Sequence, residues 1–398
     1  MRREVDWLVL RNCRVLGPLV PDFDGEFADI HISGRFIEAV EKCSSRITGD
    51  SIDMRGATVL PGLLDIHVHL DMSGGNLDEE NARSDAERVL MAVSFTRNAL
   101  HAGFTTLRDI GARNHVDFAL RDAADSGAIE SPTLFVAGRI LSPPTDGNSY
   151  YPGMYSVATE PAEIRTAAQN EIITGADFVK YMGGRDITEP DGLEDFALYN
   201  EQQVRAITET TDRLGTYAAA HCQSPVPIQV ALNAGVRTIE HGFILSDGII
   251  DELRLEKSFI VPTLRYLDTL RQYPELLPPH LFDGIEGYIE ATAHWLNKAS
   301  KAGLRMGFGT DAGTFGNHHG ENAKEALLRV RLAGLDPMEV ILQATTHSAE
   351  IIGANDRGII APGKRADIIA LAGDPLLDIT ELERPVFVML AGKTIIQK

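Results

Sequence analysis

The feature that most constrains this chain is an alternation of short apolar runs with longer amphipathic segments, which begins near residue 60. Such alternation is typical of repeated strand-helix units around a parallel sheet. The segment after Thr159, for example, is predicted to be a helix that has Pro161 in its first turn and ends at Gly175. Residues 82–100 are predicted to form another helix, which ends before Gly103. Eight candidate strands follow: 63–68, 104–109, 133–138, 177–182, 216–221, 238–241, 259–263 and 305–310. Eight such units predict an α/β fold built on a (β/α)8 TIM-type barrel.

Both ends of the chain have a different residue pattern, which favours strands over helices. Short runs rich in β-forming residues lie at 7–10, 28–32, 35–40 and 57–60, and similar runs return at 367–371, 386–390 and 394–397. We therefore expect a small β-sandwich domain built from both termini, residues 1–58 plus 358–398. The barrel domain is expected over residues 59–357.

The composition excludes several classes of protein. Apolar residues make up 44% and charged residues 24% of the 398 positions, an ordinary globular balance. Lys and Arg number 37 against 57 Asp and Glu, a formal charge of -20 that disfavours nucleic acid as a partner. No stretch of 18 apolar residues predicts a membrane span. Three cysteines in so long a chain favour a reducing compartment, so a cytoplasmic location is expected.

The strongest chemical signal lies in residues 60–70 (LPGLLDIHVHL). Residues two apart in a strand point to the same face, so His67 and His69 would present both imidazoles together. Two neutral imidazoles can chelate a divalent transition metal. With twelve histidines in the chain, such a pair alone is weak evidence. Its place at the end of the first barrel strand strengthens it, because this fold carries its chemistry at the carboxyl ends of the strands.

Further residues with metal-binding chemistry end other candidate strands. Lys180, His221, His241 and Asp311 close the fourth, fifth, sixth and eighth strands. One such residue is more often structural, but together with the histidine pair they occupy five of eight strand ends. The sequence therefore predicts a metal site at one end of the barrel.

These residues make the sequence resemble the amidohydrolase superfamily over nearly its whole length, including residues 358–369 (GIIAPGKRADII). Residues 102–109 (AGFTTLRD), 309–313 (GTDAG) and 319–322 (HGEN) are similar to the imidazolonepropionase-like branch, which contains binuclear Xaa-Pro and other dipeptide hydrolases and related amide hydrolases.

The resemblance implies two divalent metal ions. His67, His69 and Asp311 would hold the buried ion, His221 and His241 the more exposed one, and Lys180, carboxylated by CO2, would bridge both. Zinc is expected, and manganese, cobalt or iron suits the same ligands. The metals would turn a bridging water into the attacking hydroxide, and Asp311 would move its proton to the leaving nitrogen.

The resemblance says less about the substrate. His319, Tyr181, Arg185 and Arg139 lie near strand ends and are the expected substrate contacts. Two loops depart from the dipeptidase pattern, which usually has Ala-Ser-Gly-Gly after the bridging lysine and Gly-His-Gly after the third strand. This chain has YMGGRD at 181–186 and DGN at 146–148.

The leading prediction is a binuclear metal hydrolase of a carbon-nitrogen bond in a small molecule such as a dipeptide, an N-acyl amino acid, a carbamate or a urea derivative. A mononuclear cyclic-amide hydrolase or deaminase is an alternative, although such relatives generally lack the bridging lysine. A lactonase or phosphotriesterase would have the same kind of metal centre and is a less favoured alternative. A non-catalytic scaffold is a further hypothesis. The resemblance also implies a homo-oligomer.

Overall fold

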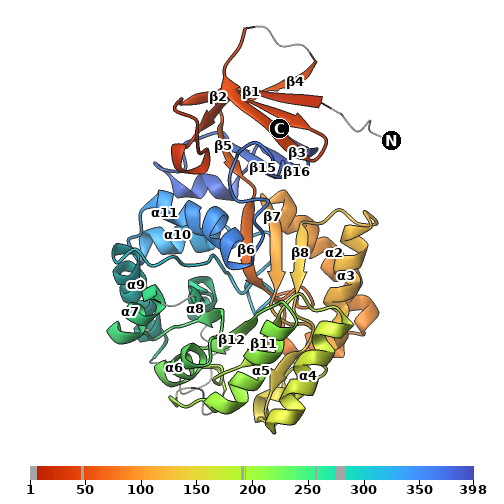
Figure 1. Ribbon diagram of the computed structural model, residues 1–398, viewed down its shortest axis with the longest axis vertical. Helices are drawn as coiled ribbons and strands as arrows, with labels where there is room; N and C mark the ends of the chain where they lie inside the picture. The colour runs from red at the N-terminus through yellow and green to blue at the C-terminus, as the bar shows by residue number, and fades with distance from the viewer. Residues whose placement is uncertain are drawn as a thin grey trace.

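The computed structural model describes residues 7–45, 49–189, 192, 194–255, 258–273, 281 and 284–398. Figure 1 shows two parts, a β-rich part that contains both ends of the described chain and a larger α/β part below it. This is the predicted fold class, a TIM-type barrel with a β-rich domain built from both termini. The boundaries expected at residues 58 and 358 stay a prediction.

The terminal domain is a single eight-stranded sheet in which the two ends of the chain pair with each other. Its order is β17-β16-β15-β5-β1-β2-β3, and β4 pairs with β1. The join is antiparallel, between β5 and β15, with Leu60 opposite Ile369. The strands are β1 (Trp7–Val15), β2 (Phe27–Ser33), β3 (Phe36–Lys42), β4 (Asp50–Asp53), β5 (Thr58–Pro61), β15 (Ile368–Leu371), β16 (Phe387–Leu390) and β17 (Lys393–Gln397). The sequence analysis missed only β4, which is short and polar.

The barrel wall consists of two parallel sheets. One has the order β6-β7-β8 and the other β10-β9-β11-β12-β13-β14. Their strands are β6 (Leu63–Val68), β7 (Phe104–Asp109), β8 (Thr133–Val136), β9 (Ile140–Ser142), β10 (Tyr155–Val157), β11 (Val179–Met182), β12 (Ala218–Cys222), β13 (Thr238–His241) and β14 (Phe259–Val261). Seven of these overlap the first seven predicted strands, with some ends shifted by two residues, and β9 and β10 belong to the loop after β8.

The eighth predicted strand, at 305–310, is not a regular strand. This segment makes one isolated bridge, from Met306 to Ile260 of β14, and Ala312 just beyond it makes another to Val68 of β6. It still closes the barrel, because the Ile66 N–H donates to the Phe308 carbonyl. Its glycines explain the irregularity: a Cβ at Gly309 would lie 2.7 Å from the Cβ of His67. The backbone approaches the first strand too closely for side chains to alternate.

Helices surround the barrel (Figure 1). They are α1 (Leu77–Ala82), α2 (Asp85–His101), α3 (Val116–Asp125), α4 (Pro161–Thr174), α5 (Glu201–Arg213), α6 (Pro225–Asn233), α7 (Asp247–Leu255), α8 (Leu264–Gln272), α9 (Ile285–Lys301), α10 (Lys324–Arg331), α11 (Pro337–Leu342) and α12 (Ser348–Ile351). The helix expected at 82–100 begins instead at Asp85, because Ser84 and Glu87 form a capping box there. None of the helices in the described ranges has both the length and the apolar character needed to cross a bilayer.

A buried ion pair fixes the irregular closing segment. Arg329 of α10 donates to Glu325 at 2.6 Å, to the Gly307 carbonyl at 2.8 Å and to the Pro262 carbonyl at 2.7 Å. Its guanidinium also lies 5.0 Å from the ring centre of Phe308. One side chain therefore ties a helix to the ends of two neighbouring wall segments.

We predict that Arg329→Met destabilises the fold by about 3–5 kcal/mol, because it leaves Glu325 as an uncompensated buried charge. Chemical denaturation followed by circular dichroism measures this free energy of unfolding. Arg331→Met, at an exposed position of the same helix, serves as the control and should change it by less than about 0.5 kcal/mol. Equal effects of the two substitutions would contradict the anchoring role.

Candidate metal centre

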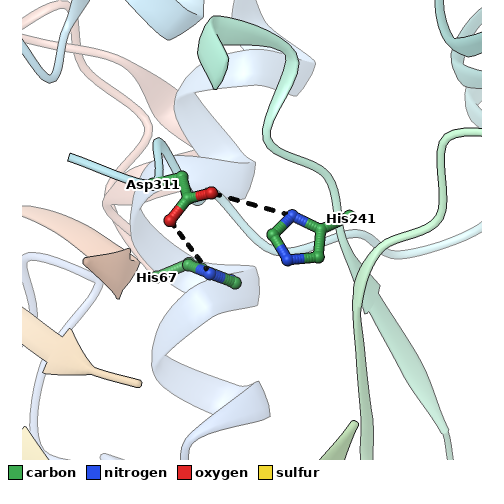
Figure 2. A group of neighbouring side chains, drawn as sticks. All are labelled: His67, His241 and Asp311. Atoms are coloured by element: carbon green, nitrogen blue, oxygen red, sulfur yellow. Dashed lines mark ion pairs between the residues drawn. The ribbon is translucent and has the colours of Figure 1, made fainter. Parts of the chain in front are cut away.

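Three side chains from distant parts of the chain meet at the carboxyl ends of the barrel strands. Asp311 lies between His67 of β6 and His241 of β13, with one carboxylate oxygen toward each ring (Figure 2). The Oδ1 atom is 3.4 Å from His67 Nε2, and Oδ2 is 4.0 Å from His241 Nδ1. All three residues are buried, so the group is held away from bulk water.

The ring orientation of His67 and His69 leaves one nitrogen of each directed at Asp311. The Nδ1 of His69 is 2.7 Å from the carbonyl oxygen of Gly111, and the Nδ1 of His67 is 2.8 Å from Glu240 Oε2. Both partners only accept, so each Nδ1 carries a proton, and in the neutral ring each Nε2 then keeps its lone pair. His69 Nε2 lies 3.6 Å from Asp311 Oδ1.

That arrangement fits a divalent cation. Asp311 Oδ1 is buried and lacks a hydrogen-bond partner within the described part of the chain. Two ring lone pairs and a carboxylate oxygen facing one another repel unless a positive charge lies between them. The fixed Nδ1 partners are the outer contacts that usually orient a metal-binding histidine.

A second pair of imidazoles lies beside the first. The Nδ1 of His221, in β12, is 3.0 Å from the Nε2 of His241. Two nitrogens bound tetrahedrally to one zinc ion would lie about 3.3 Å apart. The Nδ1 of His241 is 2.8 Å from Thr263 Oγ1, which leaves Nε2 available to an ion.

Lys180 of β11 lines the same cavity as these four histidines. Burial lowers the pKa of its ammonium group to about 8, against the opposing effects of the Glu240 and Asp311 carboxylates. Only the neutral amine can add CO2, and a lowered pKa makes that form more abundant near neutral pH.

The backbone at two of these positions is strained. His241 and Asp311 have φ angles of 71° and 63°, in the left-handed region that non-glycine residues rarely adopt. Strain of this kind persists where surrounding structure fixes it, and it concentrates at functional sites.

Two buried charges that the sequence analysis missed support His67. Glu240 accepts from His67 through Oε2, and Arg108 donates to Glu240 Oε1 at 2.8 Å. Arg108 also donates to the Ile66 carbonyl at 2.6 Å. Although burial raises the pKa of the Glu240 carboxyl, Arg108 and His67 bring it down to about 2. A signal was present, because each charge interrupts an apolar barrel strand and the two have opposite signs.

A cavity of about 390 Å³ opens over the metal-binding residues. Its walls are mainly aromatic and aliphatic. Besides the predicted ligands it is lined by Met72, Asn76, Leu77, Ile140, Gly147, Tyr150, Tyr151, Met154, Tyr155, Met182, Asp186, Thr188, Glu189, Tyr266, Leu270, Tyr273, Thr314 and Phe315. No sequence pattern marks most of these residues, because they lie in loops and in the short elements that follow the strands.

The four predicted substrate contacts do not line this cavity. Tyr181 is adjacent to the inward-facing Lys180, so its side chain points to the opposite face and packs in the core. Arg139 pairs with Glu171 at 3.0 Å.

The guanidinium of Arg185 lies 5.7 Å from the ring centre of Phe196. His319 has its Nε2 3.1 Å from the carbonyl oxygens of His69 and Met72, so it holds the backbone beside a predicted ligand.

We predict that Glu240→Gln weakens metal retention by about 10–100-fold, because the neutral amide no longer stabilises the proton on His67 Nδ1. Dialysis against graded chelator concentrations, followed by elemental analysis, measures this loss. Glu209→Gln removes a carboxylate from an exposed position and should leave metal content unchanged. Identical retention in the two variants would remove Glu240 from the metal-binding network.

Comparisons with known proteins show which proteins this chain is similar to in sequence and fold. A crystal structure of an amidohydrolase is 32% identical and superposes with a TM-score of 0.85, covering 98% of this chain and 99% of that one. A crystal structure of a Xaa-Pro dipeptidase with bound methionine in its active site is 26% identical, with a TM-score of 0.87 and coverage of 98% and 100%.

Among curated proteins, the ochratoxinase of Aspergillus niger is 26% identical over 363 residues, which covers 83% of this chain and 73% of that protein. The model of the amidohydrolase family matches residues 58–395. The resemblance stated from the sequence motifs is therefore confirmed: this chain is a member of the amidohydrolase family of hydrolases.

Proposed function

We propose that this protein is a binuclear metal-dependent hydrolase that cleaves an amide-type carbon-nitrogen bond in a small molecule. The observation that carries the proposal is the paired arrangement of ligands. His67 and His69 face Asp311 from one side, and His221 and His241 bring ring nitrogens within 3.0 Å of each other on the other. A neighbour that is by its name a dipeptidase supports an amide as the bond cleaved.

Six side chains would hold the two metals: the four histidines, Asp311 and a carboxylated Lys180. Divalent ions bound there supply Lewis acidity, which makes water a stronger acid and polarises a substrate carbonyl. We expect zinc, with manganese, cobalt and iron as further candidates. The homo-oligomeric state and the preference against nucleic acid stay predictions.

Asp311 has the position of the general acid and base. Its Oδ1 faces the His67 and His69 nitrogens that would share an ion with it, which leaves Oδ2 to accept the proton of the attacking water. The same oxygen can then deliver that proton to the leaving nitrogen. Burial of the site keeps bulk water from competing for the proton.

The test of the proposal is amine release from a mixed panel of dipeptides, N-acyl amino acids, anilides, carbamates and ureas by metal-loaded protein. Activity that disappears on chelation and returns with two metal equivalents per chain is the expected result. Full activity with one metal equivalent per chain would instead favour the mononuclear cyclic-amide hydrolase or deaminase. Esters and phosphotriesters are assayed in parallel by release of their alcohol, and hydrolysis confined to them would replace the amide with a different bond.

We predict that Lys180→Ala lowers metal content from two equivalents to one or fewer and removes nearly all turnover, because the bridging carbamate is lost. Elemental analysis and the panel assay measure both quantities. Circular dichroism checks that the variant is folded, and the half-exposed Lys298→Ala serves as the matched control. A Lys180→Ala protein with full activity would exclude the bridging role.

We predict that Asp311→Asn lowers kcat by about 100-fold to 10,000-fold, because the amide cannot carry the proton. Turnover is compared at equal metal occupancy, so that weaker binding of the metal is separated from lost proton transfer. Near-normal kcat at full occupancy would assign the proton to another residue.

A further inference from the structure

The wall of the cavity carries two carboxylates that the proposed reaction does not use. Asp186 and Glu189 both lie in the loop after β11 and both line the cavity. Backbone hydrogen bonds hold them together: the Glu189 N–H donates to the Asp186 carbonyl at 2.9 Å, and the Asp186 N–H donates to Glu189 Oε1 at 3.2 Å. The Asp186 carboxylate is held in turn by Thr188, which donates to Oδ1, and by Gln223, which donates to Oδ2.

Glu189 has an unused buried acceptor. The residue is only 6% exposed, and its Oε2 atom lacks a hydrogen-bond partner within the described residues. A buried carboxylate oxygen without a donor is costly, because burial removes the water that would otherwise solvate it. Its position in the cavity wall indicates that a bound molecule supplies the donor.

Aromatic rings surround the same end of the cavity. Tyr151, Tyr155 and Tyr266 are lining residues, and the Tyr266 hydroxyl donates to Asp186 Oδ1 at 2.9 Å. The face of an aromatic ring attracts a cation, and the attraction grows when water is excluded. Carboxylates and tyrosine rings in one wall therefore favour the same charge.

Among the lining residues that the structure describes, no cationic side chain outside the proposed metal centre is available to an anion. Lys180 is the one Lys or Arg among the lining residues in the described ranges, and it belongs to the metal centre. Arg139 is engaged by Glu171. Arg185 lies close enough to lower the pKa of Glu189, although burial raises that pKa more strongly, and its guanidinium does not line the cavity.

We propose that the substrate is an amide with a hydrophobic body and a protonated amine, and that Asp186 and Glu189 bind this amine within the tyrosine-lined end of the cavity. The inference rests on the proposed amide hydrolysis and adds the class of substrate. An ammonium group has donors for Glu189 Oε2, and it supplies the charge that balances two carboxylates. The methylene chain or ring of the substrate contacts the methionines and tyrosines of the remaining wall.

Matched substrates test this directly. The 4-nitroanilides of 5-aminopentanoic, hexanoic and adipic acid place an ammonium, a methyl or a carboxylate group at the same distance from the scissile bond. Benzamides of 1,5-diaminopentane, hexylamine and 6-aminohexanoate do the same on the other side of that bond. We expect the ammonium member of one set to exceed its carboxylate member in kcat/KM by at least about tenfold. A preference for the carboxylate member in both sets would overturn the proposal.

Glu189→Gln separates recognition of the amine from other effects. The glutamine carbonyl can still accept from the Asp186 N–H, so the loop should keep its shape. We expect the ratio of kcat/KM for the ammonium and methyl substrates to fall by at least about fivefold. The exposed Glu209→Gln should keep the wild-type ratio. Equal ratios in the two variants would overturn the assignment of Glu189.

A binding measurement distinguishes failure of this inference from failure of the proposed function. Calorimetry compares 3-phenylpropylammonium with 4-phenylbutyrate on metal-loaded protein and again after chelation, which separates carboxylate binding to metal from binding to the wall. Tighter ammonium binding that depends on Glu189, without turnover of any panel member, would refute the hydrolase and keep the amine site. Amide turnover together with equal binding of the two ligands would keep the hydrolase and refute the amine site.

Discussion

Burial of several polar groups in one barrel mouth is the constraint on which the rest of this structure depends. Four imidazoles, a carboxylate and an amine lie together there, and each would be costly without a partner. The protein meets part of this cost with its own atoms. Gly111 and Glu240 each fix a ring nitrogen, and Arg108 balances the charge of Glu240. What remains unpaired points inward, where a metal ion is the natural partner.

The same logic continues outward from the metal-binding residues. The metal-binding residues need a positive charge between them, because the His67 and His69 nitrogens face a carboxylate oxygen of Asp311. The cavity wall above it also offers negative charge, at Asp186 and Glu189. We propose that metal ions supply the positive charge near Asp311 and that a substrate amine supplies it near Asp186 and Glu189.

Sequence reasoning reached the parts of this molecule that periodicity governs. The bounds of β6, β7 and β13 match the predicted strands, because apolar runs between clear turn signals leave few alternatives. The meeting of His67, His241 and Asp311 followed from a property of the fold, since the strands of a barrel end on one face. The closing segment at 305–310 was harder to predict, because Gly307 and Gly309 allow a close backbone approach that its apolar character does not reveal.

The residues of the cavity wall could not be predicted from periodicity. Tyr151 and Glu189 lie in loops, where neither spacing nor composition fixes direction, and only the folded chain brings them to the metal centre. The orientation of Tyr181 could have been predicted from the sequence. Side chains alternate along a strand, so a residue next to the inward-facing Lys180 points away from the barrel interior.

The pairing of β5 with β15 has a consequence for how the protein folds. The first barrel strand follows β5 directly, and the Gly62 N–H between them donates to the carbonyl of Asp367. The support for the strand that carries His67 therefore comes from a segment that is very distant from it in sequence. Contacts of this kind form slowly, because the entropy of closing a long loop must be overcome first. The framework around the first histidines is therefore expected to become complete late in folding, after the local helices of the barrel have formed.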